Sequence, residues 1–296
     1  MRWVLVSGIL LLLGIGAFFF AKTRPAAEEP GWRAMIEKAG PEKAYAQFAE
    51  SVAAEPPGEQ HTAAHNFGDA LYEEKGLAGL SACDSRFGYG CFHQLVGRVI
   101  AEHGLGAIAE IQHVVGTSSD SNHGVGHGIL AYLGYTLPKL KQALAVCPSG
   151  GTAPWDCSGG VFMEYNFRTM LGEGPRLPGN NPYAPCDALE GVQKTACTFW
   201  LPEWWDRTTF GAAATSSQSF ANIGAYCDGL PKAVHGACYG GIGYAAAAAT
   251  EQNAEVSTYL CNASTANTAY RTLCNHCAAY VFTTRGKRPS CTLNEF

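Results

Sequence analysis

Cysteine and histidine recur along this chain at nearly regular intervals, and no other feature constrains the fold as strongly. One series of marks, with gaps of 30, 32, 34, 40, 41 and 36 residues, is His61, Cys91, His123, Cys157, Cys197, Cys238 and Cys274. A second series runs ahead of it with gaps of 30, 34, 39, 41 and 34 residues: Cys83, His113, Cys147, Cys186, Cys227 and Cys261. Such spacing is typical of stacked supersecondary units, so the two series predict seven tandem repeats.

Each repeat has the pattern of a helical hairpin, in which helix A ends at the first mark and helix B begins at the second. Residues 140–147 form an apolar helical stretch, Pro148 and the following glycines interrupt it, and a second helical pattern starts near Cys157. Gly160 and Gly241, three residues after their marks, are expected to let helix A approach closely. The sequence therefore predicts an all-α, disulfide-stapled, solenoid-like domain with almost no sheet.

Twelve cysteines with a single CxxC motif favour disulfides over metal sites of the CxxC…CxxC type. Neighbouring cysteines lie 8 to 14 residues apart, and pairing nearest neighbours is the simplest of several possible connectivities. The expected pairs are Cys83/Cys91, Cys147/Cys157, Cys186/Cys197, Cys227/Cys238, Cys261/Cys274 and Cys277/Cys291. Since disulfides persist in oxidising compartments, we expect the domain to lie outside the cytoplasm, in the periplasm of a bacterium.

The segment from Ala82 to Phe92, with its Cys-x7-Cys staple, resembles the Sel1-like repeats of secreted cysteine-rich bacterial proteins. This resemblance is specific over about 25 residues and looser in the later units, whose cysteines are more widely spaced. It implies a curved solenoid of paired helices that is used for binding rather than for catalysis.

An uncharged run of 18 residues, from Trp3 to Phe20, is just long enough to cross a bilayer. A cleaved signal peptide is the alternative, but bulky rings occupy the end of the run where small residues are needed. We therefore expect a single-pass membrane protein with the following organisation. The predicted parts are a transmembrane anchor at 1–21, a spacer at 22–40, the seven-unit repeat domain at 41–285, and a C-terminal tail at 286–296.

Histidines are the strongest candidates for chemistry, because two pairs with i, i+4 spacing occur at equivalent places in the first and third units. This spacing puts two imidazoles on one helical face and suits Zn or Cu. The candidate metal ligands are His61, His65, His93, His113, His123 and His127. In the alternative interpretation their ring nitrogens hydrogen bond to buried carbonyls. The pattern HGVGH lacks the glutamate of the HExxH motif of zinc hydrolases. No CxxCH haem-attachment motif occurs, so haem could bind only non-covalently, between histidines.

Tryptophans are concentrated in one short stretch, where Trp200, Trp204 and Trp205 indicate either an interaction surface or filling of the core. The two interpretations are open at this point. An interaction surface would fit aromatic side chains at this density. Core filling would fit Trp200, because other units have a small glycine at the equivalent position, three residues after the mark.

Composition excludes one class of partner and allows a large core. The formal charge of −5 without a basic stripe argues against nucleic acid, and 47% hydrophobic residues suffice for a packed domain. We expect a membrane-anchored interaction or scaffold module, an accessory subunit of a respiratory or photosynthetic complex, which contacts the bilayer through residues 3–20. The alternative is an extracytoplasmic protein that binds Zn or Cu. No catalytic residues, small-molecule substrate or firm cofactor are predicted, and the chain is not expected to be an enzyme.

Overall fold

The computed structural model describes residues 29–148, 153–170, 181–210, 216–250, 253–282 and 291. Over these ranges the regular structure is entirely helical, as predicted. The α-helices are α1 (Glu29–Ala39), α2 (Pro41–Ser51), α3 (Pro57–Lys75), α4 (Gly90–His103), α5 (Ala107–Val115), α6 (Ser119–Leu133), α7 (Leu137–Val146), α8 (Ala153–Met170), α9 (Gly191–Thr208), α10 (Ser217–Asp228), α11 (His235–Ala249), α12 (Ala254–Ser264) and α13 (Thr268–Phe282). The 3-10 helices are η1 (Gly76–Ala82), η2 (Arg86–Tyr89), η3 (Cys186–Ala188) and η5 (Lys232–Val234).

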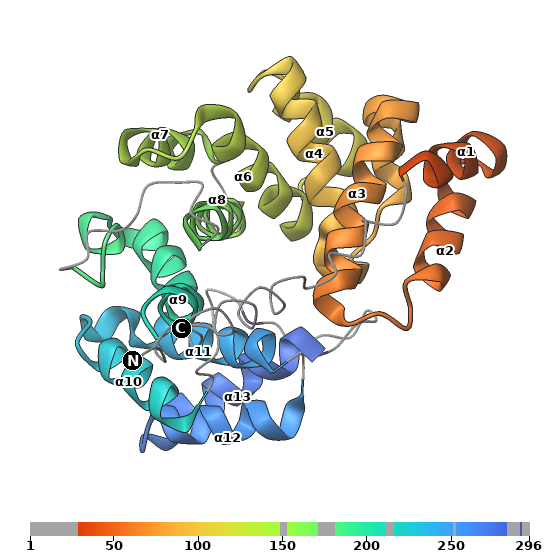
Figure 1. The fold of residues 1–296 in the computed structure, drawn as a ribbon. Coiled ribbons are helices and arrows are strands. Elements are labelled where there is room, and N and C mark those ends of the chain that lie inside the picture. Colours follow the sequence, from red (N-terminus) through yellow and green to blue (C-terminus); the bar gives the residue numbers. More distant parts are fainter. Residues whose placement is uncertain are drawn as a thin grey trace, which may run out of the picture.

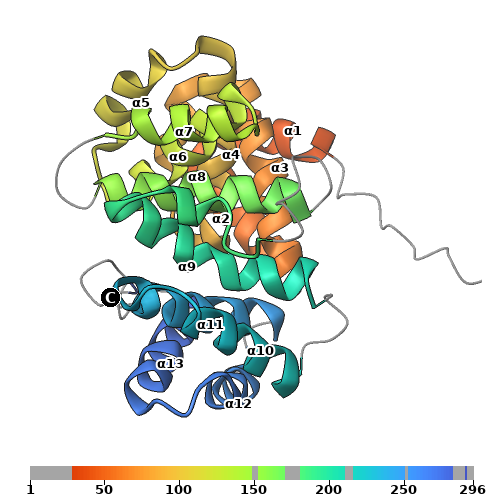
Figure 2. The ribbon, with the colours of Figure 1, turned by 90° about the vertical axis from the view of Figure 1, so that its left-hand side faces the viewer.

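Seven of these helices, one from each repeat, form an inner row in which each helix packs against the next: α3, α4, α6, α8, α9, α11 and α13. Figure 1 shows this row following a curve from the first repeats to the last. In Figure 2 the helices α10 to α13 lie below α9, which joins them to the rest. The repeat-like arrangement predicted from the ladder of marks is therefore present in the described chain.

The outer partner of each inner helix varies more than the sequence suggests. In the second unit the outer partner is η1, and in the fifth unit, among the residues that the structure describes, η3 alone stands before α9. Pro182 and Pro185 precede or abut η3, and proline disfavours a continuous helix there. The first unit has two helices before α3, and the α1 side chains Trp32 and Ile36 are buried in the common core. The packed core therefore includes α1, which lies within the stretch that was expected to be a spacer up to residue 40.

Two predicted segments lie wholly or mostly outside the part of the chain that the structure describes. The anchor at residues 1–21 and most of the tail at 286–296 lie outside the described residues. Along the part of the chain that the structure covers, no helix combines the length and apolar character needed to cross a membrane.

All six disulfides join the nearest-neighbour pairs predicted from the sequence: Cys83–Cys91, Cys147–Cys157, Cys186–Cys197, Cys227–Cys238, Cys261–Cys274 and Cys277–Cys291. Five of them tie the end of an outer segment to the first turns of the inner helix of the same unit. Closing loops of this length contributes roughly 2.5 to 3 kcal/mol each in the chain-entropy account of cross-links. The staples thus fix each hairpin at its turn.

We expect the protein isolated from an oxidising compartment to contain no free thiol, because every cysteine is paired. Alkylation under denaturing conditions without reductant should leave the intact mass unchanged, whereas alkylation after reduction should modify all 12 cysteines. Six or more thiols free before reduction would contradict the stapled arrangement.

Several pairs of neighbouring inner helices touch backbone to backbone at glycines. A Cβ atom on Gly160 of α8 would lie 1.9 Å from the carbonyl oxygen of His123 in α6, and one on Gly241 of α11 would lie 2.0 Å from that of Phe199 in α9. The expectation that these glycines admit helix A of their own unit is therefore wrong. They admit the inner helix of the adjacent unit, since only a residue without Cβ fits at that separation.

Two glycine-to-alanine variants test this packing. A Cβ on Gly243 would lie 2.0 Å from the carbonyl oxygen of Cys274, so Gly243→Ala should lower the free energy of unfolding by about 1–3 kcal/mol through overpacking. Gly97→Ala is the matched control, because nothing lies within 4 Å of a Cβ there, and it should raise stability by about 0.5–1 kcal/mol. Thermal unfolding followed by circular dichroism measures both, and equal effects would contradict the proposed role of the contact.

Candidate metal centre

Five histidines converge from three consecutive inner helices. His61 and His65 come from α3, His93 from α4, and His123 and His127 from α6. The i, i+4 spacing places each pair on one face of its helix. Figure 1 shows α4 between α3 and α6, so His93 lies between the two pairs.

Within each pair the Nε2 atoms face each other. The distance between them is 3.0 Å for His61 and His65, and 3.3 Å for His123 and His127. The ring of His93 is nearer to the second pair: its centroid lies 4.5 Å from that of His127 and 5.3 Å from that of His123, against 6.5 Å from either ring of the first pair.

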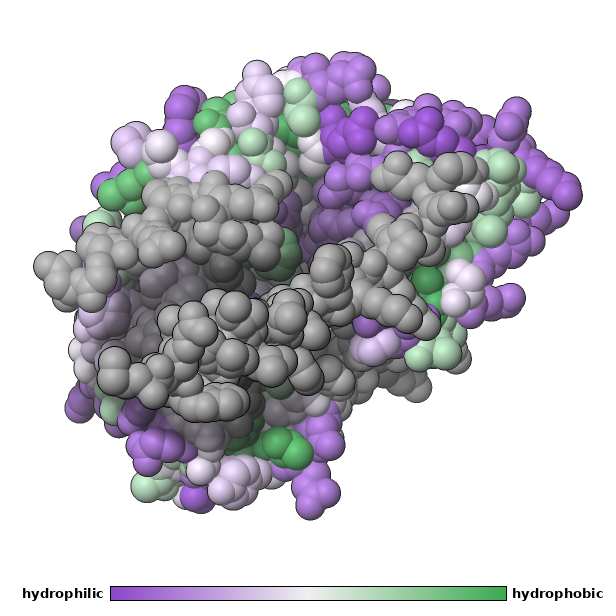
Figure 3. Space-filling view, in the orientation of Figure 1, coloured by the Kyte–Doolittle hydropathy of each residue, from purple (hydrophilic) through white to green (hydrophobic). Residues whose placement is uncertain are grey.

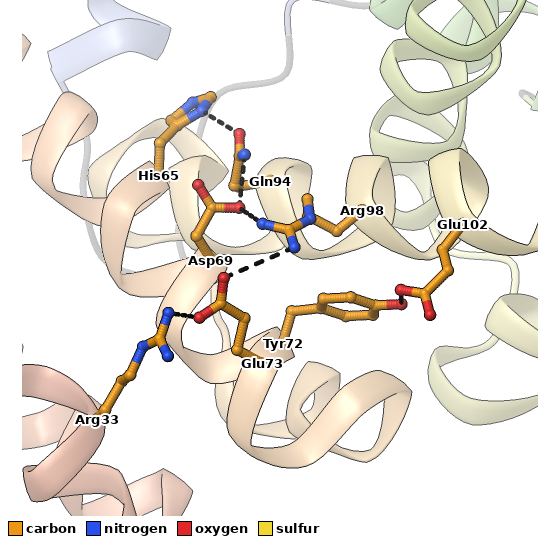
Figure 4. Close-up of polar contacts among 8 residues, drawn as sticks. All are labelled: Arg33, His65, Asp69, Tyr72, Glu73, Gln94, Arg98 and Glu102. Carbon is orange, nitrogen blue, oxygen red and sulfur yellow. Dashed lines mark hydrogen bonds and ion pairs between the residues drawn. The ribbon is translucent and has the colours of Figure 1, made fainter. Parts of the chain in front are cut away.

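The opposite ring nitrogens of the first pair are held by acceptors. Nδ1 of His61 donates to the carbonyl oxygen of Phe87 at 2.6 Å, and Nδ1 of His65 donates to Oε1 of Gln94 at 3.0 Å. The orientation of the Gln94 amide follows from its Nε2, which donates to the carboxylate of Asp69 at 2.8 Å. Figure 4 shows this row of contacts, which continues from Asp69 to Arg98.

The second pair is held in the same way. Nδ1 of His127 donates to the carboxylate of Glu164 at 3.1 Å, and the hydroxyl of Tyr135 donates to the other oxygen of that carboxylate at 2.7 Å. His123 hydrogen bonds to the backbone of Asp156. Glu164 lies 37 positions from His127 in the chain, so spacing in the sequence does not reveal this partner.

These acceptors determine which ring nitrogens carry hydrogen. Because Nδ1 of His61, His65 and His127 faces an oxygen that can only accept, it bears the hydrogen, and Nε2 of a neutral ring is then a bare lone pair. Two facing lone pairs repel each other unless a cation lies between them. Two imidazole nitrogens on one tetrahedral metal at about 2.0–2.1 Å are themselves about 3.3 Å apart, close to the spacing in both pairs.

His93 adds a third ring nitrogen to the pair formed by His123 and His127. Ligand atoms of His93, His123 and His127 all lie within 4.8 Å of one another. His93 is 5% exposed, and its Nε2 is buried with no hydrogen-bond partner among the described residues. A buried nitrogen of this kind usually has a partner, so its position beside two other lone pairs indicates a metal ligand.

Burial keeps four of these imidazoles neutral. Removal from water, together with the neighbouring imidazoles, lowers the pKa of His123 to about 3 and that of His65 to about 4. Burial also lowers the pKa of His61, and it holds the pKa of His93 well below its usual value. Neutral imidazole is the form that binds metal, so these four rings need to release no proton at neutral pH before they bind an ion.

The other predicted site residues lie elsewhere. His113 is exposed in the last turn of α5, and among the described contacts none joins its ring to that of His123. Trp200 and Trp205 are 6% and 0% exposed, so both fill the core, and Trp204 is partly buried. The ring of Trp200 closes one side of the histidine cluster, 6.2 Å from that of His123.

Comparison with known proteins adds no family to this picture. Neither a protein-family model, nor a curated protein, nor a solved structure matches the chain. The resemblance to Sel1-like repeats therefore rests on the sequence motif alone.

We expect the metal-free protein to lose stability as the pH falls below about 6.5. The unfolded chain binds protons at its histidines near that pH, whereas the folded cluster, with its lowered pKa values, does not. The unfolded state therefore gains protons first, and each buried histidine contributes a slope of up to about 1.4 kcal/mol per pH unit toward pH 4.

Urea unfolding of chelator-treated protein between pH 7 and pH 4.5 measures this slope. His123→Gln should make it shallower, while His113→Gln, which alters an exposed residue outside the cluster, should leave it unchanged. An identical pH dependence in the parent and His123→Gln proteins would show that the cluster is not the cause.

Proposed function

We propose that this chain is an extracytoplasmic metal-binding protein in which His93, His123 and His127 hold a first-row ion of the Zn or Cu type. One observation carries the proposal: the buried Nε2 of His93, which has no hydrogen-bond partner among the described residues, lies beside two Nε2 atoms, those of His123 and His127, that face each other at 3.3 Å. Imidazole nitrogen suits Zn and Cu, whereas Mg and Ca prefer oxygen ligands.

Three protein ligands leave at least one coordination position open. Structural zinc sites are normally closed by four protein ligands, so this position would take water or an external ligand. Glu164 supports the proposal because a carboxylate that accepts from Nδ1 fixes the ring of a histidine ligand and raises its basicity. We propose binding at this centre and no reaction.

The staples and the N-terminal run support the location. Six disulfides fit an oxidising compartment, and the apolar run at residues 3–20 would tether the domain to its membrane. The scaffold function predicted from the sequence, as an accessory subunit of a larger membrane complex, stays a separate prediction. The exposed large hydrophobic side chains are spread over α5, α6, α7, α8 and α12, and in Figure 3 the surface around α1 and α3 is mainly hydrophilic.

Metal analysis tests the proposal. The protein purified from the periplasm, dialysed and measured by elemental mass spectrometry should contain Zn or Cu, and the His123→Gln/His127→Gln variant should lose that ion. Glu164→Gln keeps all three ligands and should weaken binding roughly 10- to 100-fold, as removal of an outer hydrogen-bond partner does. His113→Gln is the matched control and should bind like the parent.

The disulfides keep the test interpretable, because the metal-free chain should remain folded. Circular dichroism and the thiol count would verify the fold of each variant. A folded parent protein that contains no metal and binds neither Zn nor Cu on titration would refute the proposed function.

A further inference from the structure

We infer that His61 and His65 form a second metal position, so that the five histidines hold a pair of ions. The inference rests on the proposed function, since it assigns a second ion to the same cluster. It begins from the contact within the pair: Nε2 atoms 3.0 Å apart, each opposite an Nδ1 that donates to a fixed oxygen. Without a cation, this arrangement sets two lone pairs against each other.

One ion cannot serve all five rings. Ligand nitrogens at about 2.0–2.1 Å from a common ion are at most about 4.2 Å apart. The group of ligand atoms that lie mutually within 4.8 Å contains His93, His123 and His127 but neither histidine of α3. His93, whose ring lies 6.5 Å from both of those rings, belongs with the second pair. The first pair therefore needs its own ion.

The repeat explains why the two positions are alike. His61 and His65 occupy the mark and the fourth residue after it in unit one, and His123 and His127 occupy the same two places in unit three. Both pairs lie near the start of an inner helix. In both pairs the outer hydrogen bonds come from the next unit, through Gln94 of α4 for His65 and Glu164 of α8 for His127. Each pair therefore has its own set of acceptors.

The acceptors that hold the first pair are uncharged, whereas a carboxylate holds the second pair. Gln94 is neutral, and Asp69 behind it is paired with Arg98, which also faces Glu73. Figure 4 shows this chain of contacts continuing to Arg33. The second pair instead has the carboxylate of Glu164 directly on His127.

With two protein nitrogens and neutral acceptors, the position at His61 and His65 should bind more weakly than the three-histidine position and fill after it. Both histidines of α3 are only partly buried, so water or a small external ligand can supply the remaining coordination.

Native mass spectrometry of the chelated full chain, titrated separately with Zn(II) and with Cu(II), counts the bound ions. The parent protein should take up two equivalents, and His61→Gln/His65→Gln should take up one with the affinity of the tighter position unchanged. His113→Gln should still take up two. Gln94→Leu leaves both imidazoles in place but removes the acceptor for His65, and it should weaken only the second equivalent by roughly 10- to 100-fold.

The outcomes separate the two proposals. A single equivalent that survives His61→Gln/His65→Gln overturns the second position and leaves the proposed function standing, and the pair is then a histidine contact without metal. A single equivalent lost in both pair variants means one shared ion and also overturns the inference. No bound ion overturns both proposals. If the double variant fails to fold, the Gln94→Leu titration decides alone, because an unchanged second equivalent there contradicts the position.

Discussion

Backbone contact between neighbouring inner helices is the constraint on which the rest of the structure depends. At Gly160 and Gly126 the helices α6 and α8 approach so closely that a Cβ on either glycine would lie about 2 Å from a carbonyl oxygen of the other helix. No real Cβ atom could lie so near a carbonyl oxygen, so the two helices can approach this closely only because both contact residues are glycine. Consecutive inner helices therefore behave as one closely spaced row, and side chains near their first turns are brought together across units.

The disulfides act within the units rather than between them. Five of the six join an outer segment to the inner helix of the same unit, so these covalent links stabilise hairpins, while glycine contacts join neighbouring hairpins. Units one and three have histidine at the mark where their siblings have cysteine, and they contribute four of the five rings of the cluster. If the proposed function holds, these units replace a covalent link within a hairpin by coordination between neighbouring inner helices.

The fold and the cluster differ in how far the sequence predicts them. Pairings that are local, such as Cys147 with Cys157 or His123 with His127, follow from spacing, because helical geometry and short loops leave few alternatives. The outer partners do not follow in this way. Gln94 reaches His65 across 29 positions and Glu164 reaches His127 across 37, and these separations depend on the rotation of one inner helix against another.

His113 is predicted as a metal ligand because it stands in the series of marks, but its side chain is exposed. A regular position in the repeat places a residue along the hairpin and does not determine where its side chain points. Its sibling positions hold buried or half-buried cysteines that are tied to the inner helix, and without that bond the imidazole of His113 is free to face solvent. The tryptophans illustrate the same limit. Position 200 in α9 replaces the glycine that α8 and α11 have at that offset, so its ring fills the core beside His123.

The electrostatics of the cluster argue for cations in a way that sequence alone could not. A buried polar atom without a partner costs about 1–3 kcal/mol, and His93 retains such an atom in addition to the facing lone pairs of the two histidine pairs. The carboxylate of Glu164 contacts His127 directly, so the surroundings of the second pair favour positive charge between the rings. Protonation could supply that charge, but burial disfavours a charged imidazole, and a second charge on the neighbouring ring would add repulsion. A metal ion removes the same repulsion without charging any ring, and its binding free energy then adds to the stability of the folded state.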